Sequence, residues 1–283
     1  MVRQNDNLLN QLERELPEGL LVDSTWLNKK GYSRQLQNHY ASAGWLEQPA
    51  RGVFRRPRGT LTWQQVIISL QTILLRDDPY IVGGRTALEL QGYAHFLPQK
   101  RKEVHLYGPR PLPTWLEKLP LKVRFVHHNS RKLFKNDPIT YGISSLQVNI
   151  LTNSSTSNDP LQRGLTYQPW GQWDWPLTLS TPERAILELL DELPEHESFH
   201  QVDKLMEGLS TLSPRRLQKL LVDCQSIKVK RLFFFFADRH KHAWLKQLKK
   251  DQIDLGTGNR MLVEGGKLDR TYQITVPGDL DAV

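Results

Sequence analysis

The stretch YSRQLQNHYASAGWLEQPARGVFRR, residues 32–56, determines the fold that the sequence predicts. Ser33 is a residue type favoured at helix N-caps and Gly44 one favoured at helix ends, so a helix is predicted between them. Two short apolar and aromatic segments follow, Trp45–Glu47 and Val53–Arg55, joined by a five-residue turn. The stretch therefore predicts one helix, with Leu36, Tyr40 and Ala43 on its inner face, followed by a β-hairpin.

Two further helices are predicted before this stretch. Leucines at helical spacing predict a helix over Asn7–Leu16, which Pro17–Gly19 ends. A short second helix is predicted over Thr25–Lys30. Three helices followed by a two-stranded ribbon are the arrangement of a winged helix-turn-helix, so residues 1–58 are predicted to form this DNA-binding domain.

Positive charge is concentrated in the same part of the chain. The 283 residues carry a formal net charge of +8. Residues 1–28 hold two basic and five acidic groups, a net charge of −3, whereas residues 29–58 hold seven basic groups and one acidic group, a net charge of +6. Such a concentrated positive field suits a phosphate backbone. A solvated surface that keeps the protein in solution is the alternative, and charge alone does not separate the two.

The predicted domain assigns roles in DNA binding to nine residues. The third helix would enter the major groove, where arginine donates to guanine and asparagine or glutamine pairs with adenine, so we expect base contacts from Arg34, Gln35 and Asn38. The wing and the turn between the helices are expected to contact the DNA backbone or a minor groove. The residues expected there are Lys29, Lys30, Ser33, Arg51, Arg55 and Arg56. Winged helices also serve as protein-docking modules, which is the alternative.

Residues 59–283 are predicted to form a second, mixed α/β domain, with a subdivision allowed for near 176–181. Arg56–Gly59 has the composition of a linker, and Thr60 or Thr62 is expected to begin a new helix. The elements expected next are a strand, a Gly-Gly turn and a helix within 80–97, two strands over Glu103–Tyr107 and Lys122–His127, and a long surface loop over 152–175. The three tryptophans of that loop, Trp170, Trp173 and Trp175, are expected to pack onto the core.

From Ser180 onward the pattern becomes helical. Helices are expected over Ala185–Leu190, Ser198–Leu209, Ser213–Asp223 and much of Lys228–Leu248, before a closing hairpin or extended tail. Phe233–Phe236 are expected to be buried, with neighbouring cations forming an exposed basic rim. Those cations are Lys228, Lys230, Arg231, Arg239, His240, Lys241 and His242. The overall expectation is an α+β protein with an N-terminal winged helix-turn-helix followed by a mixed α/β C-terminal domain that ends in a helical region.

The remaining composition favours a cytoplasmic protein. Cys224 is the only cysteine, so no intrachain disulfide is possible. The longest apolar run, Leu232–Ala237, is far too short to span a membrane, and the N-terminal residues lack the apolar core of a signal peptide. We expect no membrane partner, no cofactor and no metal.

Three stretches are candidates for catalysis. His196–His200 matches H-E-x-x-H, but Ser198 is a good helix cap, and a helix that begins inside the motif would point the two histidines apart. Gly83-Gly84 resembles the turn by which nucleotidyltransferases bind a triphosphate. Those enzymes need a carboxylate pair on the next strand for magnesium, whereas this chain has Glu103 and His105 there. Asp77-Asp78 is not accompanied by the Glu-x-Lys strand that a nuclease would need. From these three stretches together, we expect that the chain is not an enzyme.

Four segments together resemble the AbiEi family, the antitoxins of type IV toxin–antitoxin (abortive-infection) systems in bacteria. They are GYSRQLQNHYASAGWLEQPARGVFRR in the winged helix, VGGRTALELQGYAHFL, STPERAILELLDELP, and VKRLFFFFADRHKHAWLKQL followed by LDRTYQITVP. The resemblance implies that the winged helix represses the protein's own operon by binding inverted repeats in the promoter. Two copies on one inverted repeat, pre-formed or assembled on the DNA, are expected from the symmetry of such a site. It also implies that the C-terminal part neutralises a partner toxin, AbiEii, a nucleotidyltransferase, without a stable complex.

Two rival functions remain open at this point. One is a transcription regulator whose C-terminal domain senses a ligand and which has no toxin partner. The other is a nucleotidyltransferase that uses Gly83-Gly84. The resemblance instead makes this turn part of the antitoxin domain.

Overall fold

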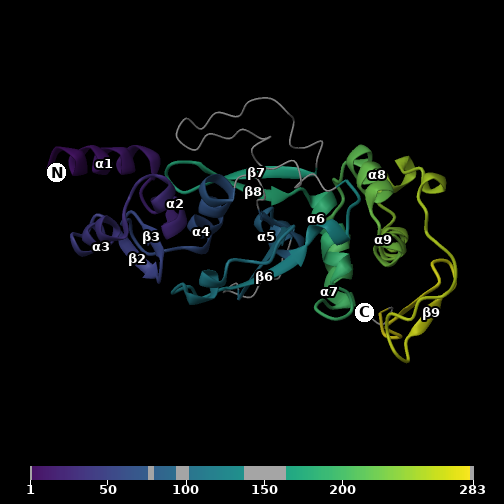
Figure 1. Ribbon diagram of the computed structural model, residues 1–283. Helices are drawn as coiled ribbons and strands as arrows, with labels where there is room; N and C mark the ends of the chain where they lie inside the picture. The colour runs from purple at the N-terminus through teal and green to yellow at the C-terminus, as the bar shows by residue number, and fades with distance from the viewer. Residues whose placement is uncertain (1, 76–79, 94–101, 137–163, 281–283) are drawn as a thin grey trace.

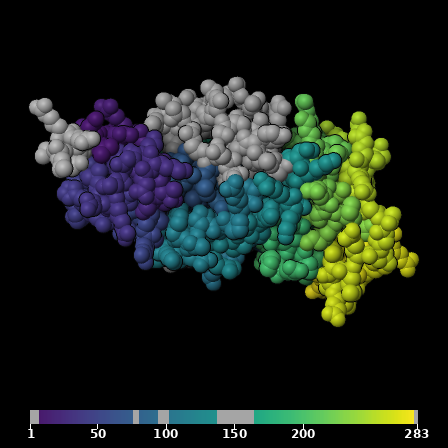
Figure 2. Space-filling view, viewed as in Figure 1, coloured from purple at the N-terminus to yellow at the C-terminus, as the bar shows by residue number. Residues whose placement is uncertain are grey.

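The computed structural model describes residues 2–75, 80–93, 102–136 and 164–280. The molecule is elongated, with the winged helix at one end, a β-sheet in the middle, and helices with a small hairpin at the other end (Figure 1). Figure 2 shows the atoms of the winged helix at the end of the molecule opposite the C-terminal residues. Within the described ranges, every helix is too short or too polar to cross a membrane.

The winged helix-turn-helix has the predicted three helices and hairpin, with one additional strand. Strand β1 joins the hairpin to make a three-stranded antiparallel sheet of order β1-β3-β2. Asp23 caps the second helix and Ser33 caps the third, each through a side-chain oxygen that accepts a backbone N–H. The elements are α1 (Val2–Glu15), β1 (Leu21–Asp23), α2 (Ser24–Lys29), α3 (Arg34–Ser42), β2 (Glu47–Ala50) and β3 (Val53–Arg55).

The turn of the wing is tighter than the sequence indicated. Strand β2 begins at Glu47, so the predicted strand at Trp45 is wrong, and the turn consists of Arg51 and Gly52. Gly52 has a φ of +74°, a conformation that glycine adopts without steric cost. Pro49 is tolerated in β2 because this strand lies at the edge of its sheet.

One helix connects the winged helix to the central sheet. It comprises α4 (Trp63–Ser69), which Thr62 caps as predicted, and a π-helical continuation, η1 (Leu70–Leu74). Ser69 Oγ accepts the backbone N–H of Leu21 in β1 at 2.8 Å. Two residues later, Gln71 donates to the carbonyl oxygens of Tyr80 (2.8 Å) and Thr178 (3.0 Å) and accepts from the Thr178 N–H (3.0 Å). Both side chains are fully buried, so this helix holds the two sheets in a fixed relation.

The predicted linker at Arg56–Gly59 is held in place by hydrogen bonds. The backbone N–H of Gly19 donates to the Arg56 carbonyl at 2.9 Å, and Arg55 Nη2 donates to the Gly59 carbonyl at 2.6 Å. The buried hydrophobic side chains of the winged helix and of the sheet belong to one continuous cluster. Residues 56–59 are therefore not a flexible linker between two separate cores. The division of roles between residues 1–58 and 59–283 stays a prediction about function.

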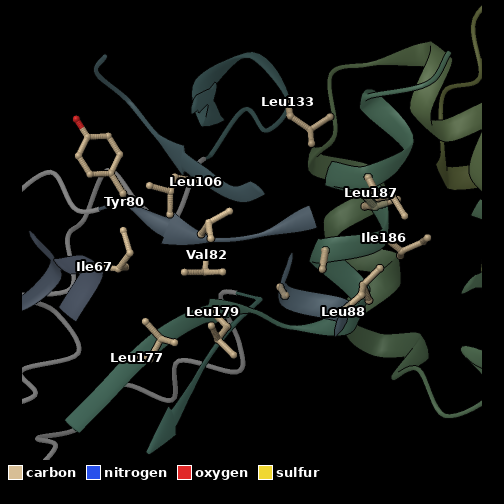
Figure 3. Close-up of a cluster of buried hydrophobic side chains, with 14 of the residues drawn as sticks. Ile67, Tyr80, Val82, Leu88, Leu106, Leu133, Leu177, Leu179, Ile186 and Leu187 are labelled. Carbon is tan, nitrogen blue, oxygen red and sulfur yellow. The ribbon is translucent and has the colours of Figure 1, made fainter. Parts of the chain in front are cut away.

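The central sheet has five strands in the order β6-β5-β4-β8-β7. The short central strand β4 is antiparallel to β5 and parallel to β8, while β5 and β6 are parallel and β7 and β8 antiparallel. In Figure 3, Val82 of β4 lies among Leu106, Leu179 and Ile67, and α6 contributes further apolar side chains. The elements are β4 (Ile81–Val82), α5 (Gly84–Leu90), β5 (Glu103–Gly108), β6 (Arg124–Asn129), β7 (Leu165–Trp170) and β8 (Trp175–Ser180).

The β7–β8 hairpin corrects the expectation of a long loop over 152–175. Gly171 and Asp174, both with positive φ, form the turn between two six-residue strands. Trp175 is 4% exposed and stacks on Trp170, as expected of core tryptophans, but Trp173 at the turn is 54% exposed and lies over the Arg58 guanidinium. Residues 152–163 and Asp77-Asp78 lie outside the described residues.

The C-terminal region is helical, as predicted, and ends in a hairpin, one of the two alternatives that the sequence left open. Phe233–Phe236 are buried, and Phe233 packs against Trp244. The expected basic rim is wrong for several residues: Lys230 is buried, and Arg231 donates to the carbonyl oxygens of Leu255 and Gly258. The elements are α6 (Pro182–Asp191), α7 (Phe199–Gly208), α8 (Pro214–Asp223), α9 (Ile227–His240), the short turns η7 (Ala243–Gln247) and η8 (Lys250–Gln252), and strands β9 (Lys267–Asp269) and β10 (Ile274–Val276).

Replacement of Gln71 by leucine is expected to destabilise the protein by about 3 kcal/mol or more, because it leaves two buried carbonyls and one buried N–H without partners. Urea unfolding followed by circular dichroism measures the change. Gln168→Leu, on the exposed part of β7, is the matched control and should change stability by less than about 0.5 kcal/mol. Equal stabilities for the two variants would contradict the bridging role of Gln71.

Candidate nucleic-acid interface

Helix α3 presents the three residues that were predicted to read bases. Ser33 Oγ accepts the backbone N–H of Leu36 at 3.3 Å and so fixes the start of the helix. Arg34, Gln35 and Asn38 are all exposed and lie within one helical face. His39 is also exposed on this helix; the sequence prediction omitted it.

The inner face of α3 differs from the prediction. Tyr40 is buried as expected, but Ala43 is exposed and Leu36 is only half-buried. Gln37 is 2% exposed and takes an inward position that the sequence pattern did not indicate. A polar side chain at an inward position contradicts the apolar periodicity on which the prediction depended.

The two lysines of the turn between α2 and α3 have different surroundings. Lys30 Nζ lies 2.9 Å from Glu15 Oε2 and 5.6 Å from the centre of the Trp26 ring. Lys29 is exposed and has no ion pair with any residue that the structure describes. The Lys30 side chain is 41% exposed, whereas the Glu15 oxygen with which it pairs is buried, so Lys30 is partly held by the protein's own carboxylate.

Three arginines of the wing and its root, Arg51, Arg55 and Arg56, separate into two kinds. Arg51 lies at the exposed turn of the wing and forms no ion pair within the described part of the chain. Arg55 is 5% exposed, and its Nε donates to Glu47 Oε2 at 2.5 Å. Arg56 Nη1 donates to the carbonyl oxygens of Glu13 and Leu16, both at 3.1 Å.

Acidic residues from α1 and the following turn neutralise the root of the wing. Glu18 accepts from Arg58 at 2.6 Å and lies 3.5 Å from Arg56. The acidic excess of residues 1–28 and the basic excess of residues 29–58, separate in the sequence, are thus partly paired in the fold. Within residues 29–58, the cations without a described ion pair are Lys29, Arg34 and Arg51, which lie at the helix turn, at the start of α3 and at the wing turn.

The H-E-x-x-H motif forms a structural ion pair. Helix α7 begins at Phe199, directly after the Ser198 cap position, as the sequence predicted. Glu197 is buried and accepts from Arg85 Nε at 2.7 Å, which raises the pKa of the arginine further. Among the described residues, no group of three histidine, cysteine, aspartate or glutamate side chains could hold a metal ion.

The Gly83-Gly84 turn holds a carboxylate of the protein itself. The Gly84 N–H donates to Glu188 Oε2 at 2.9 Å, and a Cβ atom on Gly83 would lie only 2.2 Å from that oxygen. Glu188 is fully buried and also accepts from Arg184 Nε at 2.7 Å. The carboxylate therefore occupies the space beside the glycines in which a triphosphate would have to bind.

His105 stands where a nucleotidyltransferase has its second metal-binding carboxylate. It lies on β5, two residues after Glu103, and its Nδ1 is 2.9 Å from His128 Nε2. Burial lowers the pKa of His105 to about 4, so the imidazole is neutral at physiological pH. Glu103 is paired with Arg124, which lowers the pKa of its carboxyl group.

Comparisons with known proteins identify the family. Residues 5–99 match the family model described as "Transcriptional regulator, AbiEi antitoxin N-terminal domain", and residues 101–277 match "Transcriptional regulator, AbiEi antitoxin, Type IV TA system". The chain belongs to the AbiEi antitoxin family. The resemblance stated from the four sequence segments is thereby confirmed.

A solved structure shares the fold. The RV2827C protein from Mycobacterium tuberculosis superposes with a TM-score of 0.55 at 15% identity, over 94% of this chain and 89% of that one. The comparison with curated proteins found no match. In this AbiEi antitoxin, the two matched regions meet between α5 and β5, so both contribute strands to the one central sheet.

The burial of Arg55 and its two partners lead to a prediction about the stability of the protein. Arg55→Met is expected to destabilise the AbiEi antitoxin by about 2 kcal/mol, because the Gly59 carbonyl loses its donor and the wing loses the ion pair with Glu47. Arg51→Met, at the exposed turn, should change stability by less than about 0.5 kcal/mol. Thermal unfolding measures both, and a destabilised Arg51 variant beside an unaffected Arg55 variant would reverse the assignment.

Proposed function

We propose that this AbiEi antitoxin represses its own operon by binding inverted repeats in the promoter through α3 and the wing. The observation that carries the proposal is the arrangement of Lys29, Arg34 and Arg51, three exposed cations without described ion pairs on the turn, the helix and the wing. Their charges are available to phosphates, whereas most cations at the root of the wing are bound to the protein's own acids.

Each part of the surface has its own role in this proposal. Helix α3 enters the major groove, where Arg34 donates to guanine and Gln35 and Asn38 pair with adenine. Lys29 and Arg51 bind phosphates on the two sides of the groove, and Lys30 and Ser33 add contacts near the start of α3. The remaining two residues of the predicted set support the wing from inside, as their partners indicate: they are Arg55 and Arg56. Two copies bind the two halves of an inverted repeat.

The antitoxin role is assigned to the rest of the chain. Family membership gives a type IV antitoxin, and we propose that residues 59–283 neutralise a nucleotidyltransferase toxin without forming a stable complex with it. The filled Gly83-Gly84 turn and the neutral His105 count against a nucleotidyltransferase activity of this chain itself.

A ligand-responsive regulator is a second candidate, favoured by one cavity. A cavity of about 340 Å³ lies between α9 and the β9–β10 hairpin, with Asp238, Arg239 and Tyr272 among its lining residues. This volume is within the range of small-molecule sites. Calorimetric titration with candidate metabolites, in the presence and absence of operator DNA, tests this candidate directly.

The DNA surface is tested by exchanging its three exposed cations for glutamine. The triple variant Lys29→Gln, Arg34→Gln, Arg51→Gln should weaken binding to all DNA and lower the slope of log K against log salt by about 0.9 for each phosphate that the variant no longer neutralises. The control triple Arg215→Gln, Lys219→Gln, Lys249→Gln removes the same charge from exposed positions at the opposite end of the molecule. Equal effects of the two triples on affinity would mean that only net charge matters and would contradict the assigned surface.

Arg34 is expected to determine sequence preference. Arg34→Ala should reduce the ratio of affinities for promoter and scrambled DNA by about tenfold, since one bidentate base contact contributes about 1–3 kcal/mol of discrimination. Fluorescence anisotropy with both DNAs at one salt concentration measures the ratio. A variant that discriminates like the native protein would remove Arg34 from the base-reading set.

The division of roles predicts that repression and neutralisation are separable. The triple variant with weakened DNA binding should repress less but should still rescue growth when the toxin is co-expressed from an independent promoter. Growth rescue and a promoter–reporter assay measured in the same strains test this. Loss of both functions in a variant that unfolds at the same temperature as the native protein would contradict the division.

A further inference from the structure

A buried amide connects the helices that present the DNA-reading surface. Gln37 lies on the inner side of α3 and is 2% exposed. Its Nε2 atom lies 2.8 Å from Asn28 Oδ1, at the end of α2, and 2.8 Å from the carbonyl oxygen of Tyr32, in the turn between the helices. One side chain of α3 thus contacts both the helix and the turn that precede it.

The chemistry of the partners determines the orientation of this amide. The Tyr32 carbonyl can only accept a hydrogen bond, so the Gln37 atom beside it must be the nitrogen. The second hydrogen of the same nitrogen points at Asn28, which must present its oxygen. Both donors of Gln37 are therefore used, in one orientation.

Tyr32 extends the connection to the first helix. Its hydroxyl donates to the Leu8 carbonyl in α1 at 3.0 Å, and its ring is fully buried near Tyr40 of α3. Burial, aided by the nearby Glu15 carboxylate, raises the Tyr32 pKa to about 12, so the hydroxyl remains a donor at physiological pH. Gln37 and Tyr32 together tie α1, α2 and α3 by directional hydrogen bonds.

We propose that Gln37 is a positioning residue for sequence reading: its amide fixes the rotation and angle of α3 relative to α2. The inference rests on the proposed function of α3. Apolar packing alone allows small rotations, whereas hydrogen bonds depend steeply on angle. A rotated helix would misplace the bidentate base contacts but would still bring cations near phosphates, so selectivity decreases before general affinity does.

The test compares the affinity ratio between promoter and scrambled DNA in the full-length protein. Gln37→Met keeps the approximate volume and removes both donors; it should lower the ratio about tenfold and change the affinity for scrambled DNA less than about twofold. Gln91→Met is the control, because Gln91, directly after α5, also donates two hydrogen bonds but lies outside the winged helix. It should leave the ratio unchanged.

A rescue distinguishes positioning from packing. In the double variant Gln37→Lys, Asn28→Asp, the ammonium group can donate to both original positions and its charge is compensated, so most of the selectivity should return. A folded Gln37→Met protein with native selectivity overturns the proposal. If that variant does not fold, Asn28→Ala, at an exposed position, replaces it: a decrease of about threefold in the ratio supports the proposal and an unchanged ratio overturns it.

The failure of the proposed function gives a different result. If the native protein itself shows no preference for its promoter, the ratio is one before any substitution, and the error lies in the function assigned to α3. Circular dichroism at the binding temperature confirms that each variant compared is folded.

Discussion

Two buried polar side chains on one helix hold the molecule together. Ser69 accepts a hydrogen bond from strand β1 of the wing sheet, and Gln71, two residues later, bonds to the backbone of Tyr80, directly before β4, and of Thr178 in the neighbouring strand β8. Because both are fully buried, their partners would be left unsatisfied if either sheet moved. The wing and the sheet therefore form one packed unit, and α3, the helix proposed to read DNA, is presented from a rigid base.

Folding also determines which positive charges of residues 29–58 are paired with the protein's own acids and which stay available at the surface. The acidic N-terminal segment lies against the root of the wing, where Glu18 binds Arg58, and Arg56 donates to the carbonyl oxygens of Glu13 in α1 and of Leu16 directly after it. Most of the positive charge of the segment is thereby structural. What remains for a partner is a smaller set at the helix turn, the start of α3 and the wing turn. Such a spacing suits a duplex groove, whose phosphates lie on both sides of the bases.

Local signals in the sequence were sufficient for most elements. Ser33 and Thr62 mark helix starts because caps act over three residues, and the structure places both as caps. Long-range partners were not predictable in this way. Gln37 lies inward because it donates to the Tyr32 carbonyl, and Arg55 is bound within the protein because it donates to the Gly59 carbonyl. Neither contact produces a periodic pattern in the sequence. The β7–β8 hairpin was missed because its turn-forming residues outweighed two short strands.

The central claim is that the winged helix of this AbiEi antitoxin reads a specific DNA site. The most direct test is fluorescence anisotropy of the purified protein with DNA from its own promoter and with scrambled DNA of equal length, titrated over a range of salt concentrations. The account predicts tight binding to the promoter that persists at salt concentrations where the scrambled DNA is released. Equal affinities for the two DNAs at every salt concentration would contradict it and would make the winged helix a docking module.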